Sequence, residues 1–172
     1  EDEAAYGYNA YSLLKTGADE YGKRIPITLK SFEDYKPALY AYIDIPFVAA
    51  LGLTEAAVRL PSAIFGTFTI LVLYFLVKQL FHGDETLALL SSLLLAISPW
   101  HIMLSRSTSE VIVSIFFVFI QLYALMRLQN KFHIAWIIVA CISGILAFSA
   151  YTASRIFVLI LTATVFLFSI RR

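Results

Sequence analysis

Acidic residues open the chain, and basic side chains that could act with them recur further along. Asp2 and Glu3 stand side by side, Lys36 follows in the front segment, and Arg106 and Arg155 fall in short polar gaps of an apolar remainder. A carboxylate can take the proton from an attacking hydroxyl, and Lys or Arg can neutralise a phosphate as its bond to a sugar breaks. This set suits a reaction in which a lipid-linked phosphate leaves and a hydroxyl attacks.

Each of these residues also has a purely structural interpretation. Asp2 could cap a helix and Glu3 could be a favourable first-turn charge, which is worth ~0.3 to 1 kcal/mol. Lys36 could be an anchor at a membrane surface, and His101 could be an ordinary interfacial histidine. Further polar residues could contact a substrate at the same surface: Tyr6, Asp34, Tyr35, His101 and Tyr151.

Long apolar runs must position these residues. The chain is 60% hydrophobic and 15% charged, and its mean hydropathy is +0.79. A helix needs ~20 apolar residues to cross a bilayer. We therefore expect an all-α polytopic membrane protein with a bundle over residues 58–172, in which about five transmembrane helices occupy residues 58–80, 86–105, 110–128, 132–151 and 155–170.

The front segment, residues 1–57, is predicted to be an extracytoplasmic loop. Residues 1–59 hold nine acids against six bases, whereas residues 60–172 hold three against seven. Two helices lying in the membrane interface are expected at about residues 4–16 and 37–53, joined by a turn-rich loop over 17–36. The second is too short to span and contains Asp44 and Pro46, and a charge near mid-bilayer costs ~3 kcal/mol or more.

Basic residues concentrate in alternate gaps between the runs, and short loops rich in Lys and Arg stay cytoplasmic. The gaps at 52–59, 105–110 and 151–155 carry one Arg each, so we place them outside the plasma membrane together with the front segment. An outside Arg opposes this trend, which makes an anionic partner attractive for Arg106 and Arg155. Arg106 and Glu110 are four apart and could instead form an ion pair on one helix face.

Several function classes are disfavoured. A net charge of +1 argues against nucleic-acid binding. The single Cys141 can form neither an internal disulfide nor a thiolate metal site. The alternative to an enzyme is a non-catalytic module, a transporter or a scaffold subunit. Transporters keep ionisable groups near mid-bilayer, and the five predicted spans have no Asp, Glu, Lys or Arg in their interiors.

A family resemblance rests on the order and spacing of five short motifs, each weak alone: Asp2-Glu3-Ala4, Tyr35-Lys36-Pro37, Val58-Arg59-Leu60-Pro61-Ser62-Ala63, Pro99-Trp100-His101 and Tyr151 to Arg155. Together they resemble the C-type glycosyltransferases that use polyprenyl-phosphate sugars, especially the protein O-mannosyltransferases and the lipid A aminoarabinose transferases. The likeness covers the whole chain, as the front membrane module of the prokaryotic branch without its first transmembrane helix. The chain opens without an initiator Met, so we expect a piece that is inactive alone.

The resemblance implies roles for the residues above. Asp2 falls on the base that activates the acceptor hydroxyl, with Glu3 supporting it or contacting the acceptor. Lys36, with Arg106 or Arg155, holds the phosphate of the donor. The implied activity is inverting transfer of a mannose-like hexose or a pentose from polyprenyl phosphate to a protein or lipid acceptor, with membrane lipids around the enzyme.

The chain departs from the family pattern at the position of a metal ligand. In the aminoarabinose branch a Glu precedes the Lys and ligates a metal, whereas this chain has Tyr35 there and Asp34 one position earlier. Ala38 stands where a second proline is common. No cofactor is therefore assigned and no metal site is expected, although a divalent metal stays open.

Overall fold

The computed structural model describes residues 2–31, 34–130 and 132–170, and it does not describe the side chains of residues 31, 34, 130 and 165–170. Within these residues the chain is mostly helical, as predicted, with one two-stranded sheet. The elements in chain order are α1 (Asp2–Thr16), β1 (Thr28–Ser31), β2 (Asp34–Pro37), α2 (Leu39–Leu51), α3 (Glu55–Leu80), α4 (Glu85–Ala96), α5 (Pro99–Arg106), α6 (Glu110–Asn130), α7 (Ile134–Ala150) and α8 (Ser154–Ile170).

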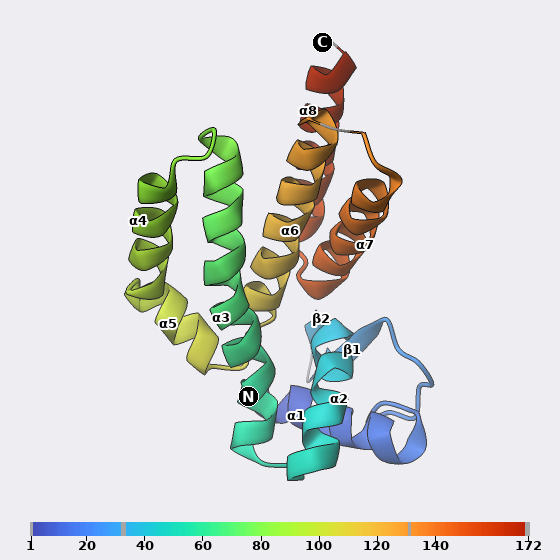
Figure 1. The fold of residues 1–172 in the computed structure, drawn as a ribbon. Coiled ribbons are helices and arrows are strands. Elements are labelled where there is room, and N and C mark those ends of the chain that lie inside the picture. Colours follow the sequence, from blue (N-terminus) through green and yellow to red (C-terminus); the bar gives the residue numbers. More distant parts are fainter. Residues whose placement is uncertain (1, 32–33, 131, 171–172) are drawn as a thin grey trace.

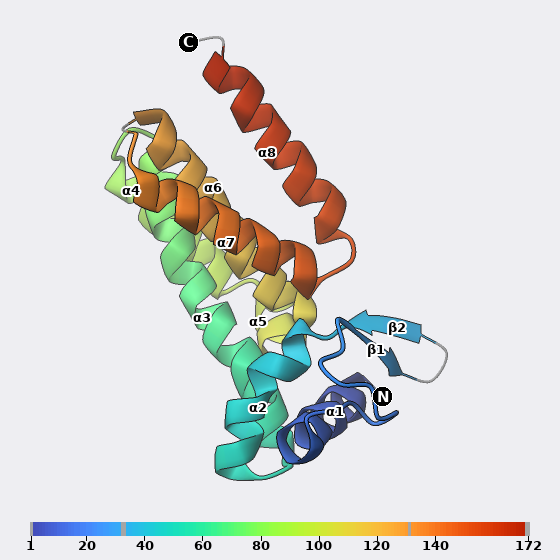
Figure 2. The ribbon, with the colours of Figure 1, turned by 90° about the vertical axis from the view of Figure 1, so that its right-hand side faces the viewer.

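The elements form two parts. The helix α1, the hairpin and α2 make a layer across one end of the bundle of longer helices (Figure 1). The α5–α6 and α7–α8 turns point toward this layer, while the α3–α4 and α6–α7 turns lie at the far end (Figure 2). The polar gaps around Arg106 and Arg155 are therefore at the same end of the bundle as α1.

Fewer helices than expected are long enough to cross a membrane. By length and composition α3 and α6 qualify, and the pair α4 and α5 makes a third if it is one broken span, among the described residues. The count of five spans is not confirmed. At ~1.5 Å per residue, the 17 residues of α7 fall short of ~30 Å of hydrocarbon.

The segment 86–105, expected to be one transmembrane helix, is not a continuous helix. It is two helices that meet at 58° between Ala96 and Pro99. Proline cannot donate the backbone hydrogen bond that would continue α4, and it disfavours the helical conformation at Ser98, which instead stands as the N-cap of α5.

The all-α prediction is wrong for the segment expected to be a loop. Strands β1 and β2 pair antiparallel, with Leu29 opposite Lys36 and Lys30 opposite Tyr35. A hairpin alone is marginally stable in water. Here Leu29 is only 2% exposed and packs in the core with side chains of α1. Tertiary contacts therefore stabilise strands that the local sequence does not predict. Because Pro37 ends β2, the helix expected from residue 37 begins at Leu39.

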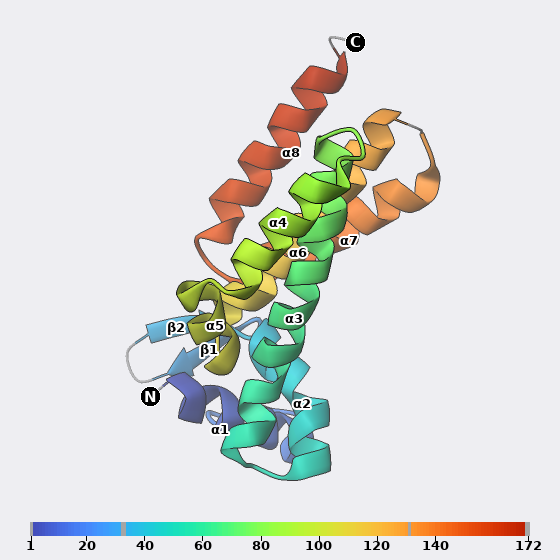
Figure 3. The same cartoon turned by 60° about the vertical axis from the view of Figure 1, so that its left-hand side comes forward.

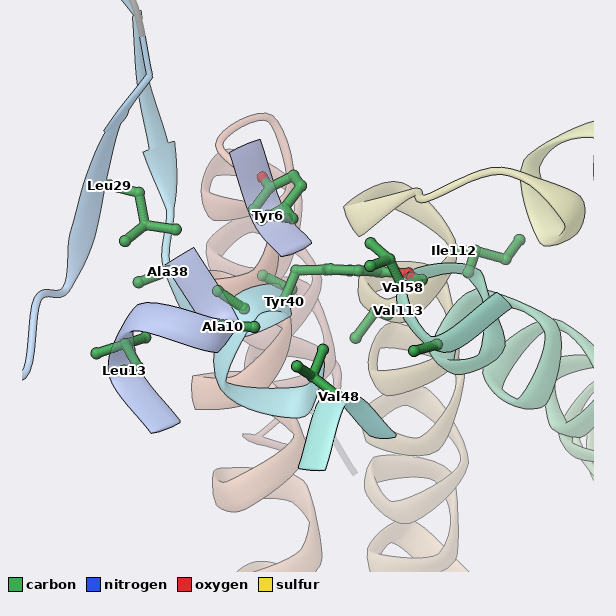
Figure 4. Packing of buried hydrophobic residues seen from close by; sticks show 13 residues of the cluster. Tyr6, Ala10, Leu13, Leu29, Ala38, Tyr40, Val48, Val58, Ile112 and Val113 are labelled. Atoms are coloured by element: carbon green, nitrogen blue, oxygen red, sulfur yellow. The ribbon is translucent and has the colours of Figure 1, made fainter. Parts of the chain in front are cut away.

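One core joins the layer to the bundle (Figure 4). Tyr6 and Ala10 lie one turn apart on α1 and are almost fully buried, and they meet Tyr40 of α2. Val58 of α3 and Ile112 of α6 belong to the same cluster. Burial of this shared surface holds the layer against the ends of α3 and α6.

A close approach joins α5 to α3. His101 is 6% exposed, and its Nε2 lies 3.1 Å from the carbonyl oxygen of Gly66. Ser105, one turn later, packs where a Cβ at Gly66 would lie. Figure 3 shows α4 and α5 along α3. The missing side chain of Gly66 is what allows this contact.

We expect Gly66→Val to lower the thermal unfolding temperature of the full-length protein in detergent micelles by several degrees. The added atoms collide with Ser105, and overpacking of this kind costs ~1–3 kcal/mol. Ala63→Val, at an exposed position of the same helix, is the control. Equal unfolding temperatures for the two variants would contradict this account of the packing.

The layer also contains a buried acid without a partner. Asp44 of α2 is fully buried, and neither carboxylate oxygen has a hydrogen-bond partner within the described part of the chain. Burial, and secondarily the negative charge of Glu3, raise the pKa of Asp44 to about 8. The carboxyl is therefore largely neutral at pH 7 in the folded protein.

This raised pKa predicts a pH-dependent stability difference between the wild type and Asp44→Asn. Unfolding restores an ordinary pKa of 3.8, so between about pH 4 and 8 the folded state holds a proton that the unfolded state releases. Relative to the variant, the wild type should lose several kcal/mol as pH rises through this window and level off above it. Denaturant unfolding at pH 5 and pH 8.5 measures this; a constant difference would refute the raised pKa.

Candidate active site

The two acids at the start of α1 contact different partners. Asp2 forms an ion pair with the Nζ of Lys36. Glu3 accepts two hydrogen bonds from Arg59, from Nε at 2.7 Å and from Nη2 at 3.1 Å, and Arg59 also pairs with Glu55 one turn before it. Successive helical residues point about 100° apart, so one acid faces the hairpin and the other faces the start of α3.

The register of the hairpin explains why Lys36 reaches Asp2. Side chains of a strand alternate between its faces, and directly opposed residues share a face. Lys36 stands opposite the buried Leu29 and its side chain is only 12% exposed, whereas Tyr35 is 64% exposed. The strand thus aims Lys36 inward, toward α1, and turns Tyr35 outward.

Tyr6 contacts both Lys36 and the start of α6. The Nζ of Lys36 lies 5.9 Å from the centroid of the Tyr6 ring, which packs 5.1 Å from the ring of Tyr40. The Tyr6 hydroxyl donates a hydrogen bond to the carboxylate of Glu110, the first residue of α6. Burial, and then the charge of Glu110, raise the pKa of Tyr6, so the hydroxyl stays protonated as a donor.

The two arginines expected at the site lie at the same end of the bundle. Arg155, in the first turn of α8, has its guanidinium 5.5 Å from the ring centroid of Phe148. Its Nε is buried and has no hydrogen-bond partner in the described part of the chain. The start of α8 is tied to α6 by Ser114 and Ser154, whose hydroxyls lie 2.5 Å apart.

Arg106 is exposed at the end of α5. The shared helix face expected for Arg106 and Glu110 does not exist, because α5 ends at Arg106 and α6 begins at Glu110, with residues 107–109 between them. Glu110 instead accepts the hydrogen bond from Tyr6.

The other expected substrate contacts are dispersed. His101 is buried between α5 and α3, where its ring contacts the carbonyl oxygen of Gly66. Tyr151 is half-buried in the α7–α8 turn. The side chain of Asp34 lies outside the described residues. The structure therefore brings together Asp2, Lys36 and Tyr6, with Glu3 on the next position of the same helix.

A pocket opens beside Glu3. It measures about 500 Å³ and lies between α1 and the start of α3, with Tyr8, Leu53 and Arg59 among its lining residues. Gly7 forms part of its wall, where an added Cβ would lie 2.7 Å from a methyl group of Val58. A glycine here lets α1 approach α3 closely.

No group of three or more His, Cys, Asp or Glu side chains that could hold a metal occurs among the described residues.

Sequence reasoning missed the connection between Tyr6 and Glu110. The two residues are 104 positions apart, and no local spacing indicates that they meet. The buried Asp44 was noted only as a charge that opposes a membrane span. Its apolar surroundings in the sequence were the available signal that it would be buried.

Comparison with known protein families matches residues 35–172 to the dolichyl-phosphate-mannose-protein mannosyltransferase family. Comparison with curated proteins and with solved structures finds no match. The matched residues include Lys36, Glu110, Arg106 and Arg155. The match begins after Asp2 and Glu3 of α1. It extends over most of the chain and agrees with the mostly helical, apolar structure. The chain therefore belongs to the dolichyl-phosphate-mannose-protein mannosyltransferase family.

Proposed function

We propose that this chain is the membrane part of an inverting glycosyltransferase. It transfers a mannose-like hexose or a pentose from a polyprenyl phosphate to a protein or lipid hydroxyl. Family membership supports the reaction class. The observation that carries the proposal is the contact between Asp2 and Lys36 at one end of an apolar bundle. This contact supplies a base for the acceptor and a cation for the donor within one site.

Asp2 acts as the general base in this proposal. Its carboxylate takes the proton of the acceptor hydroxyl, and the oxygen attacks the anomeric carbon of the sugar. The bond between that carbon and the phosphate oxygen breaks, and its electron pair leaves with the polyprenyl phosphate. One displacement from the opposite side inverts the anomeric centre. Such a single step requires Asp2 to act as a base and not as a nucleophile.

Lys36 holds the leaving phosphate. Before the donor binds, the ammonium is satisfied by Asp2 and by the face of the Tyr6 ring. A donor phosphate competes with Asp2 for this ammonium, so binding of the donor frees the carboxylate for the acceptor. Arg155 has a buried N–H without a partner in the described chain, and Arg106 is exposed at the end of α5, at the same end of the bundle. Either can add a second cation to the phosphate.

The acceptor approaches from the side of Glu3. The pocket between α1 and α3 lies on this side, and its charged lining residues are two acids and one arginine. That balance disfavours the donor phosphate and suits a neutral or cationic acceptor. Tyr8 is 53% exposed there and offers a ring face to a sugar or a side chain.

We further propose that the layer faces outward from the plasma membrane in this multi-pass protein. The bias of Lys and Arg toward the gaps at the other end of the bundle supports this orientation. Lipid-linked sugars and acceptors then meet at the outer membrane surface, where α1 and the hairpin lie.

Asp2→Asn and Lys36→Gln should each reduce sugar transfer by about a hundredfold in the full-length enzyme. The first removes the base and the second removes a charge that stabilises the departing phosphate. The measurement is release of polyprenyl phosphate from a labelled polyprenyl-phosphate sugar in the presence of acceptor.

Two substitutions of the same kind serve as controls. Asp84→Asn removes the charge of an acid, and the new Asn is also a good N-cap residue for α4. Lys23→Gln removes an exposed lysine of the front segment. Both should retain activity. Full transfer by Asp2→Asn, at normal membrane expression, would remove Asp2 from the mechanism.

Tyr6→Phe and Glu110→Gln test whether the hydrogen bond between these two residues helps to position Lys36. Each weakens the same hydrogen bond, so each should lower transfer by about tenfold, and the double variant should be little worse than either alone. A raised KM for the donor is the expected signature, because the position of Lys36 changes. Fully additive losses would show that the two residues act separately.

A further inference from the structure

A second polar pocket lies at the far end of the bundle from the candidate active site. It measures about 390 Å³ and is formed by the end of α3, the turn that follows it, and the last turns of α6. Its lining includes Phe75, Lys78, His82, Tyr123 and Arg127. Figure 2 shows this end of α3 and α6 opposite the layer of α1, the hairpin and α2.

The lining of this pocket is basic. It contains Lys78, His82 and Arg127 and no Asp or Glu among its described residues. The Nζ of Lys78 lies 2.5 Å from the carboxylate of Glu85, so part of its charge is compensated at the rim. Arg127 has no such compensation within the described chain. Its only hydrogen bond there is long, 3.5 Å from Nη1 to the side-chain oxygen of Gln79.

Aromatic rings hold the guanidinium of Arg127 in place. Its central carbon lies 5.7 Å from the ring centroid of Tyr123 and 5.4 Å from that of Trp136, and the two rings pack edge to face. A guanidinium has five N–H donors, and within the described chain Arg127 uses one of them in the long hydrogen bond to Gln79. The two rings thus pack around the cation, and its other donors have no hydrogen-bond partner in the described part of the chain.

A simpler role of such cations is to offset the partial negative charge at the end of a helix, since Lys78 and Arg127 lie in the last turns of α3 and α6. That role requires only charge. It explains neither the pocket nor the aromatic support of one arginine.

We propose that this pocket binds the phosphate of an anionic phospholipid headgroup. Basic pockets between helices at a membrane surface are sites for such headgroups. Phe75, Leu80 and Phe81 are about half exposed beside it, which provides apolar surface for the acyl chains. Tyr123 and Trp136 have the chemistry of residues at the headgroup level of a bilayer. The inference does not depend on the proposed glycosyltransferase reaction.

The experiment uses full-length protein purified in a neutral detergent. Thermal unfolding is measured after addition of phosphatidylglycerol, of phosphatidylcholine, or of inorganic phosphate. Phosphatidylglycerol should raise the unfolding temperature of the wild type by several degrees, and phosphatidylcholine and inorganic phosphate should not. In Arg127→Gln, binding of phosphatidylglycerol, measured by titration, should weaken about fivefold, and Lys78→Gln/Arg127→Gln should lose most of the temperature shift.

Arg24→Gln is the matched control, because it removes an exposed arginine of the front segment, at the opposite end of the bundle. It should keep the full response to phosphatidylglycerol. An unchanged response in Lys78→Gln/Arg127→Gln would overturn the site. An equal response of the wild type to inorganic phosphate would overturn the assignment to a lipid. Sugar transfer need not be measured, so failure here is distinct from failure of the proposed reaction.

Discussion

The position of Tyr6 is the contact on which the candidate site depends. Its ring packs on Tyr40 and lies beneath Lys36, and its hydroxyl reaches Glu110 at the start of α6. Three parts of the chain that are distant in sequence therefore share one buried side chain. The packing of Tyr6 holds the first turn of α1 beside the hairpin, and this position lets Asp2 face Lys36.

Part of this arrangement could be predicted from the sequence. Apolar runs indicated a membrane protein, family motifs pointed to Asp2 and Lys36, and the distribution of Lys and Arg separated two ends of the bundle. These signals are local, or they are sums over many residues. The hairpin was missed because its strands are four residues each and are stabilised mainly by the burial of Leu29 against α1. Its register turns Lys36 inward, and no propensity of the segment predicts that direction.

Other features were missed for the same kind of reason. The bend between α4 and α5 has a local cause in Pro99. A prediction from the apolar composition of residues 86–105 as a whole does not detect the effect of one proline. The hydrogen bond from Tyr6 to Glu110 and the burial of Asp44 arise only when α1, α2 and α6 pack together. The two ends of the bundle then differ in chemistry. A carboxylate and a lysine meet at one end, and the described residues that line the pocket at the other end include three basic side chains and no acid.

We propose that the donor phosphate binds at Lys36, between α1 and the hairpin. An electron cryomicroscopy structure of the full-length protein with bound polyprenyl phosphate tests it most directly. We predict that the phosphate lies within hydrogen-bond distance of the Nζ of Lys36 and that the ion pair with Asp2 is broken. A phosphate bound elsewhere in the bundle, with the pair of Asp2 and Lys36 intact, would contradict this account.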